Sequence, residues 1–300
     1  MQIKHVVALT LVCVLTSCAL NHQFLRPEKV PANKEQAFLK NGRGDTIMVM
    51  HFGVNHQPTF TTKTGTPVAQ DYTIESAVLD NKDKTHKING WFLKPAKAQP
   101  DITLLLLHGN GGNILTEYLG AAEFAKRGMQ VFVIDYSGYG FSEGKATWKN
   151  VWNDAGVALQ YLHSRKDVQG TSLAIYGQSY GGYTAIPLAQ KYESLIDGVI
   201  TEGAPTSRKD IGAHLTKLGI IAKALIKEKH SALKAIAKYH KPMLIIQSDE
   251  DEIVPFRMGQ QLYARAHEPK TFYRIHGPHL AGLSNSPDSI AYYVRKTVKP

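Results

Sequence analysis

Short runs of apolar residues alternate with longer amphipathic segments along most of this chain. Continuous apolar residues at 102–107, 130–134 and 173–176 predict strands that are buried on both faces. Segments 113–127 and 148–164 carry apolar side chains at helical spacing, which predicts two amphipathic helices. An alternation of strands and helices is typical of a parallel sheet with helices on both of its faces.

The same pattern predicts further elements on either side of these segments. Residues 72–79 and 88–93 are expected to form two strands joined by the polar turn 80–83. Strands are also predicted at 196–201, 243–246 and 270–275, which makes eight, with helices at 182–189, 258–266 and 286–298.

Residues 203–240 interrupt the alternation with a basic amphipathic stretch, in which lysines are interspersed with leucine and isoleucine. One interpretation is a small helical cap whose apolar face binds acyl chains or lies against a membrane. The other is a helix pair packed on the sheet with solvated lysines. The pattern alone favours neither.

The region before the predicted sheet has little periodicity. Residues 21–70 are rich in Asn, Pro, Thr and Lys, and only 46–50 suggest a small strand. We therefore expect 18–70 to be a tether and N-terminal extension. The main domain is predicted to start near Asp71 and to occupy 71–300.

Composition indicates a globular chain with a sizeable core. Of the 300 residues, 43% are hydrophobic and 20% charged, which argues against global disorder. The net charge is +10, but the lysines are spread out and no nucleic-acid-binding motif is present, so no nucleic-acid partner is expected. The charge indicates either a solvated basic surface or a surface that faces anionic lipid.

The first residues resemble a bacterial lipoprotein signal. A short basic segment precedes an apolar segment, 6–16, which is too short to span a bilayer. Leu15-Thr16-Ser17-Cys18 then resembles a lipobox. The resemblance implies that residues 1–17 are a signal peptide and that Cys18 carries lipid, which would anchor the protein to a membrane of the bacterial envelope. Ala19 would favour the outer membrane in a Gram-negative cell; an uncleaved anchor is the alternative.

Only two cysteines occur, Cys13 and Cys18. Once Cys18 is lipidated, the mature domain has no thiol for a disulfide, a catalytic cysteine or a cysteine-ligated metal. The histidines lack spacings such as H-E-x-x-H, so no metal is expected.

A possible nucleophile lies between the predicted strand at 173–176 and the next helix. Residues 177–181 read Gly-Gln-Ser-Tyr-Gly, and strand, G-x-S-x-G, helix is the context of a nucleophile elbow. There the hydroxyl of Ser179 would be exposed at a helix N-terminus, whose dipole favours developing negative charge.

A glycine-rich loop follows the strand at 102–107. Residues 108–113 read His-Gly-Asn-Gly-Gly-Asn, so backbone N–H groups can point into a cavity. In an elbow-type hydrolase this loop and the residue after the nucleophile form the oxyanion hole. This nominates the backbone N–H groups of Asn110 and Tyr180, the alternative being a turn that caps the next helix.

An acid and a histidine follow the last two predicted strands. Asp251 precedes Val254-Pro255, and we prefer it to Asp249 as the acid; a mere helix-capping loop is the alternative. We prefer His279 to His276, because the turn at 277–278 should carry the chain toward Ser179.

The order Ser179, Asp251, His279 is the order expected of an α/β-hydrolase. From about residue 72 onward the chain resembles that superfamily, closest to small esterases, monoglyceride-lipase-like enzymes and serine aminopeptidase-like proteins. Residues 135–144 match the motif D-x-R-G-x-G-x-S-x-G, with Ser137 in place of the arginine that would pair with Asp135. The resemblance implies an α/β-hydrolase fold with a small cap at 203–240.

These residues predict a serine hydrolase of carboxylic esters, with a lipid or small-molecule ester as substrate and no cofactor. Residues 177–183 also resemble the elbow of prolyl-oligopeptidase-like peptidases, so peptide or amide hydrolysis is the second hypothesis. A non-catalytic lipoprotein of the envelope is the third. Oligomeric state is not predicted.

Overall fold

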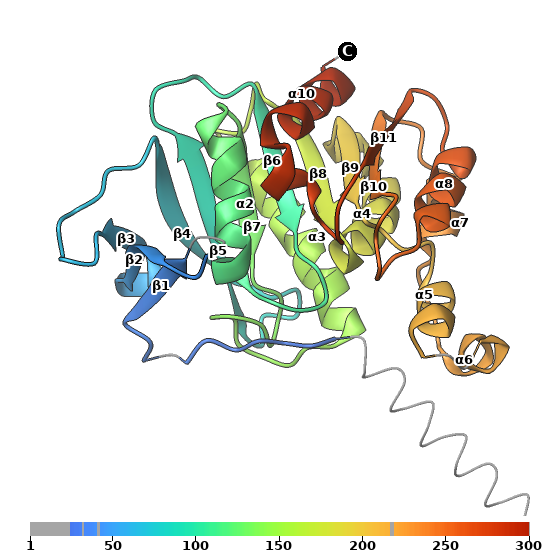
Figure 1. Ribbon diagram of the computed structural model, residues 1–300, viewed down its shortest axis with the longest axis horizontal. Coiled ribbons are helices and arrows are strands. Elements are labelled where there is room, and N and C mark those ends of the chain that lie inside the picture. Colours follow the sequence, from blue (N-terminus) through green and yellow to red (C-terminus); the bar gives the residue numbers. More distant parts are fainter. Residues whose placement is uncertain (1–24, 32, 41–42, 217–218, 300) are drawn as a thin grey trace, which may run out of the picture.

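An eight-stranded sheet forms the centre of the computed structural model, which describes residues 25–31, 33–40, 43–216 and 219–299 (Figure 1). The strand order is β11-β10-β9-β8-β6-β7-β5-β4. β5 runs antiparallel to both of its neighbours, and the remaining pairs are parallel. The strands are β4 (Tyr72–Asp80), β5 (Lys87–Pro95), β6 (Ile102–Leu107), β7 (Gln130–Ile134), β8 (Ser172–Gln178), β9 (Gly198–Glu202), β10 (Met243–Ser248) and β11 (Lys270–Ile275). The predicted, mostly parallel sheet of eight strands is confirmed.

Helices cover both faces of the sheet, as the alternation of elements predicted. Residues of α3, α4, α7 and α8 form one apolar core with the sheet. Residues of α2 and α10 form a second core on the opposite face. Helices with described bounds are α2 (Ile114–Lys126), α3 (Trp148–Ser164), α4 (Tyr180–Lys191), α5 (Arg208–Leu215), α6 (Ile220–Leu225), α7 (Ala232–Ile236), α8 (Phe256–Arg265), α9 (Gly282–Asn285) and α10 (Pro287–Val298), with short 3-10 helices at Val54–His56 and Glu193–Leu195.

The segment before Asp71 is more ordered than its sequence predicts. β1 (Gln36–Lys40), β2 (Thr46–Phe52) and β3 (Pro58–Thr61) form an antiparallel sheet, of which only the middle strand was predicted. Apolar side chains of this sheet join the core that contains α2 and α10. The N-terminal extension therefore contains folded strands well before Asp71.

Residues 26–30 run beside two loops that follow central strands. The Arg26 N–H donates to the Asn110 carbonyl at 2.8 Å. Val30 and Gly140 are joined by an N–H to carbonyl bond of 2.9 Å, and the Gly140 N–H donates to the Glu28 carbonyl. The N-terminal segment thus fastens the loops at the carboxyl edge of the sheet.

The stretch 203–240 contains helices α5, α6 and α7, which differ in what they pack against. α7 packs against α4 and α8 and so belongs to a helical layer. α5 and α6 pack against each other and extend beyond α7 and α8 (Figure 1). Ile220 and Ile221 of α6 are exposed. Among the described residues, no helix has both the length and the apolar character that a membrane crossing requires.

Candidate active site

Ser179 stands in a strained turn between β8 and α4. Its φ of +52° is rare for a residue with a side chain, and it precedes the first turn of the helix. Gly181 must lack a side chain, because a Cβ would lie 1.9 Å from the Leu107 carbonyl oxygen. A Cβ on Gly177 would lie 2.5 Å from the Gly181 carbonyl oxygen. The two glycines of the motif therefore permit the close packing that presents the serine.

Asp251 and His279 form a hydrogen-bonded pair at the same edge of the sheet. Oδ2 of Asp251 lies 2.7 Å from Nδ1 of His279, and the two side chains are 1% and 10% exposed. Asp251 Oδ1 also accepts bonds from the backbone N–H groups of Ile253 and Val254 at 2.9 and 2.7 Å. A carboxylate held this way orients the imidazole and accepts a proton carried on Nδ1.

The loop after β9 connects the serine with the histidine. The Ser179 N–H donates to the Glu202 carbonyl at 2.8 Å. Gly203 has a φ of +60°, and a Cβ there would lie 2.9 Å from Cε1 of His279. Within the described residues no hydrogen bond joins the Ser179 hydroxyl to His279. Such contacts are often long in unliganded enzymes and tighten when substrate binds.

The glycine-rich loop 108–113 lies directly against the serine. A Cβ on Gly109 would lie 3.6 Å from Cβ of Ser179. Tyr139 holds this loop, because its hydroxyl donates to the Asn110 carbonyl at 2.8 Å. Asn110, Ser179 and Tyr180 line one small cavity of about 60 Å³. The structure therefore places Asn110 and Tyr180 at the same cavity as Ser179.

His108 is the buried anchor of that loop. Its side chain is fully buried, and its ring centroid lies 4.2 Å from that of Tyr136. Burial lowers the pKa of His108 to about 4, so the ring is neutral near pH 7. Nδ1 contacts the Gly109 carbonyl at 2.9 Å, whereas Nε2 has no hydrogen-bond partner in the described structure.

The rival acid and histidine, Asp249 and His276, pair with each other instead. Asp249 Oδ1 lies 2.9 Å from Nδ1 of His276, whose side chain is 72% exposed. Arg274 donates its Nε–H to Asp249 Oδ2 at 2.7 Å and lowers the pKa of that carboxyl. Together with Glu250 these groups could offer ligand atoms to a metal. The Arg274 guanidinium already pairs with the Asp249 carboxylate and would repel a cation.

Ser137 occupies the position at which the related motif has arginine, and Asp135 and Ser137 take part in separate hydrogen-bond networks. The carboxylate of Asp135 is fully buried and accepts the backbone N–H groups of Ile114 and Phe141 at 2.7 and 2.9 Å. Burial raises the pKa of Asp135 to about 6. Ser137 instead donates its hydroxyl to the buried Asp154 at 2.7 Å. The loop after β7 therefore needs no ion pair at Asp135.

The structure brings together Ser179, Asp251, His279, Asn110 and Tyr180 at one edge of the sheet. Cys18 lies outside the described residues. The sequence did not single out Gly203, or the side chains of Trp148 and Arg208 that line the cavity at Ser179. A glycine after a predicted strand, at the same edge as the elbow, was the one available signal for Gly203.

Residues 98–231 match a family model described as serine aminopeptidase, S33. The match contains Ser179 and the glycine-rich loop and ends before Asp251. The human alpha/beta hydrolase domain-containing protein 17B is 34% identical over 170 residues, which are 56% of each chain. An uncharacterized protein of Salmonella typhi, YfhR, is 28% identical over 207 residues, 65% of this chain and 70% of YfhR.

Solved structures show the fold. An esterase from Pyrococcus furiosus superposes with a TM-score of 0.63 at 18% identity, covering 76% of this chain and 92% of the esterase. Est1E from Butyrivibrio proteoclasticus, solved with ferulic acid bound, gives 0.63 at 17% identity and covers 75% and 100%. The chain therefore has the α/β-hydrolase fold, as predicted. Over the matched residues the chain is therefore similar to proteins described as serine aminopeptidase and as alpha/beta hydrolase domain-containing.

Proposed function

We propose that this α/β hydrolase cleaves carboxylic esters through a covalent acyl-enzyme, with Ser179 as nucleophile, His279 as base and Asp251 as its acid partner. The observation that carries the proposal is the 2.7 Å contact between Asp251 and His279 beside a serine at φ +52°. This chemistry requires a nucleophile, a base and a group that orients the base.

The reaction begins when the Ser179 hydroxyl attacks the ester carbonyl carbon and His279 Nε2 takes its proton. Asp251 keeps the other imidazole proton on Nδ1 and stabilises the imidazolium. Negative charge on the former carbonyl oxygen is held by the N–H groups of Asn110 and Tyr180, each worth about 3 kcal/mol.

Collapse of this intermediate breaks the ester bond, and His279 returns its proton to the leaving alcohol. Water then attacks the acyl group on Ser179, with His279 again accepting the proton. The released carboxylic acid and the free serine complete the cycle. No step requires a cofactor.

Aminopeptidase activity is the second candidate, because the matched family is described by that activity. An aminopeptidase needs acidic groups to bind the ammonium of its substrate. None of the described residues that line the cavity at Ser179, or the larger pocket beside it, is an aspartate or a glutamate. This lining favours esters.

The deciding experiment compares hydrolysis of p-nitrophenyl esters of increasing acyl length with hydrolysis of aminoacyl-naphthylamides. We expect turnover of esters that is lost in Ser179→Ala. Turnover of the naphthylamides alone would replace the ester proposal with the peptidase one. A folded protein that hydrolyses neither class would support a non-catalytic envelope protein.

We further propose that lipid on Cys18 holds the enzyme at the bacterial envelope. The sequence 15–18 supports this, since a lipidated cysteine with several acyl chains gives stable membrane attachment. In Cys18→Ala we expect the protein either to be soluble or to remain an uncleaved precursor. Incorporation of labelled palmitate should be abolished. Unchanged labelling would disprove the anchor.

A further inference from the structure

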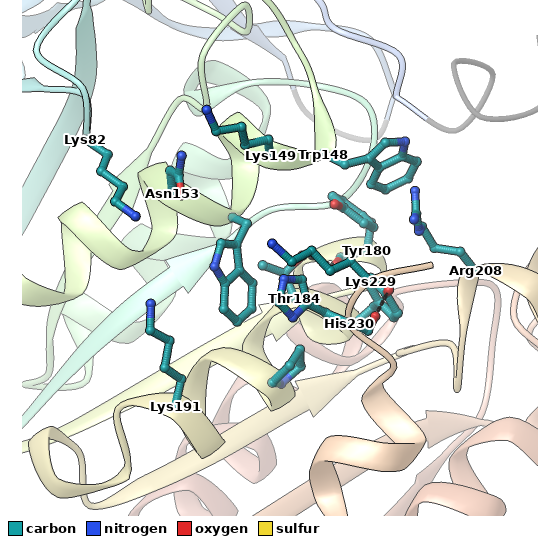
Figure 2. Close-up of a pocket in the computed structure, with 13 residues that line it drawn as sticks. Lys82, Trp148, Lys149, Asn153, Tyr180, Thr184, Lys191, Arg208, Lys229 and His230 are labelled. Atoms are coloured by element: carbon teal, nitrogen blue, oxygen red, sulfur yellow. Dashed lines mark hydrogen bonds between the residues drawn. The ribbon is translucent and has the colours of Figure 1, made fainter. Parts of the chain in front are cut away.

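A second, larger pocket lies beside the cavity at Ser179. It encloses about 600 Å³, which is in the range of small-molecule sites (Figure 2). Its walls come from the turn between β4 and β5, from α3 and α4, from the start of α5 and from the loop before α7. The lining residues are Lys82, Trp148, Lys149, Trp152, Asn153, Tyr180, Tyr183, Thr184, Pro187, Lys191, Arg208, Lys229 and His230.

Cationic side chains surround this pocket. In Figure 2, Lys82 and Lys149 lie on one side of Tyr180 and Arg208 on the other, Lys229 lies beside His230, and Lys191 stands apart at the lower left. No aspartate or glutamate is among the described lining residues. Such a lining carries a large excess of positive charge and favours an anion.

Few of these charges are neutralised by the protein. Lys149 lies 3.6 Å from the Asp83 carboxylate. Lys82, Lys191 and Lys229 form no ion pair with a carboxylate in the described residues. The pKa of His230 is lowered, first by burial and then by Lys229, Lys191 and Arg208. Lys229, Lys191 and Arg208 therefore lie close enough to the His230 ring to act on it electrostatically.

Arg208 is the buried member of the cluster. It is 8% exposed, and its guanidinium lies 4.2 Å from the centre of the Trp148 ring. The guanidinium donates to the Lys227 carbonyl, and within the described residues no carboxylate pairs with it. Glu228 accepts the Arg208 backbone N–H at 2.7 Å and the Tyr183 hydroxyl at 3.1 Å.

Aromatic rings supply an apolar wall. Trp152 stacks on His230 with 4.1 Å between ring centroids, and Lys191 Nζ lies 5.9 Å from the Trp152 ring. Trp148 packs edge-on against Tyr180 at 4.8 Å. A ligand in this pocket can thus place apolar carbon against the rings and an anionic end among the cations.

The pocket is adjacent to the proposed nucleophile. Trp148, Tyr180, Tyr183 and Arg208 line both this pocket and the cavity that contains Ser179. A molecule that occupies both would present one end to the serine. The adjacency makes the larger pocket a place for the non-reacting part of a substrate.

We propose that this pocket binds an anionic group, a carboxylate or a phosphate, that the substrate carries on an apolar arm away from its ester bond. That the anion belongs to a substrate rests on the proposed ester hydrolysis, whereas binding of the anion does not require turnover. Cations that lack a carboxylate partner would exchange water for the anion and form charge-assisted hydrogen bonds.

Tryptophan fluorescence measures the binding directly. The chain has three tryptophans; Trp148 and Trp152 line the pocket, while Trp91 is fully buried. In full-length Ser179→Ala we expect hexyl phosphate and hexanoate to change the emission saturably, and neutral hexanol to bind much more weakly. Added salt should weaken the binding of both anions. The tighter of the two anions identifies which group the site prefers.

Lysine variants test the residues. Lys191→Gln and Lys229→Gln should each weaken binding of hexyl phosphate by about tenfold. The matched control is Lys63→Gln, an exposed lysine on the loop after β3, which should bind like the parent. Equal affinity for hexanol and the anions, or unchanged affinity in both pocket variants, would overturn the proposal.

Hydrolysis assays separate this inference from the proposed function. Mono-p-nitrophenyl adipate and p-nitrophenyl hexanoate have acyl chains of the same carbon count and differ in a terminal carboxylate. We expect Lys191→Gln to lower kcat/KM for the adipate relative to the hexanoate by about tenfold. Hydrolysis of both without any such change would refute the anion pocket and leave ester hydrolysis intact. Anion binding without hydrolysis of any ester would refute the proposed function and leave the pocket.

Discussion

Replacing Asp251 by asparagine tests the acid of the proposed triad without changing its size. Oδ2 of Asp251 accepts from Gln247 Nε2 at 3.1 Å and faces His279 Nδ1 at 2.7 Å. Oδ1 accepts the backbone N–H groups of Ile253 and Val254 at 2.9 and 2.7 Å. Each carboxylate oxygen therefore faces two donors. In either orientation, the NH2 group of an asparagine would face two donors that the carboxylate oxygen had accepted.

The less costly orientation keeps the amide oxygen on the two backbone N–H groups. The NH2 group then faces His279, which can accept from it only by moving its own proton from Nδ1 to Nε2. A His279 protonated on Nε2 cannot take the proton of Ser179. The wrong tautomer lowers kcat by about 10⁴-fold, which is about 5 kcal/mol of barrier. The mismatched donors should cost about 1–3 kcal/mol of folding stability.

The assay is kcat for a p-nitrophenyl ester, with urea unfolding as the measure of stability. Asp249→Asn is the matched control, because Asp249 pairs with the exposed His276 and with Arg274. We expect its kcat to stay close to that of the parent. A folded Asp251→Asn protein with kcat within about tenfold of the parent would refute the assignment of the acid.

Two further predictions follow from residues that pack around the site. Gly203→Ala puts a Cβ 2.9 Å from Cε1 of His279, at a residue whose φ is +60°. Because the imidazole is displaced, kcat should fall by more than the loss of stability explains. A kcat equal to that of the parent would show that His279 does not act from this position. Burial lowers the pKa of His108 from 6.5 to about 4, so the unfolded chain binds more protons between these pH values and this contribution to stability is lost as pH falls. Between pH 7 and pH 5 the unfolding free energy should therefore fall by about 2 kcal/mol less in His108→Gln than in the parent. An equal fall in both proteins would contradict a buried neutral imidazole.

The main sheet could be predicted because its central strands are buried on both faces. Such strands leave continuous apolar runs, as at 102–107 and 130–134, and the structure places β6 and β7 at those residues. The glycines of the elbow follow from close backbone approach, which the motif itself encodes. Local sequence was sufficient for these elements.

The antiparallel sheet β1–β3 could not be predicted in the same way. Its strands are short and half-exposed, so their alternation is weak. Their stability comes from buried Leu39, Met50 and Phe60, which pack into the core that also contains Trp91 and Tyr118. Contacts between segments so far apart in sequence leave no local signal.

The candidate site likewise contains residues that the sequence predicted and residues that it did not. Ser179 and the glycine-rich loop lie in recognisable motifs, and Asp251 and His279 were suggested by their positions after predicted strands and by their order along the chain. The cationic pocket was not predicted, because its lysines and Arg208 come from separate turns and helices that only the fold brings together. In the sequence they were part of a general positive charge.

The central claim is that Ser179 is a nucleophile activated by His279. Its most direct test is labelling of the folded protein with a fluorophosphonate, followed by digestion and mass spectrometry. We expect one modified peptide, with the adduct on Ser179, and its loss in Ser179→Ala. Absence of any adduct on the folded parent protein, or an adduct on a different residue that survives in Ser179→Ala, would contradict it.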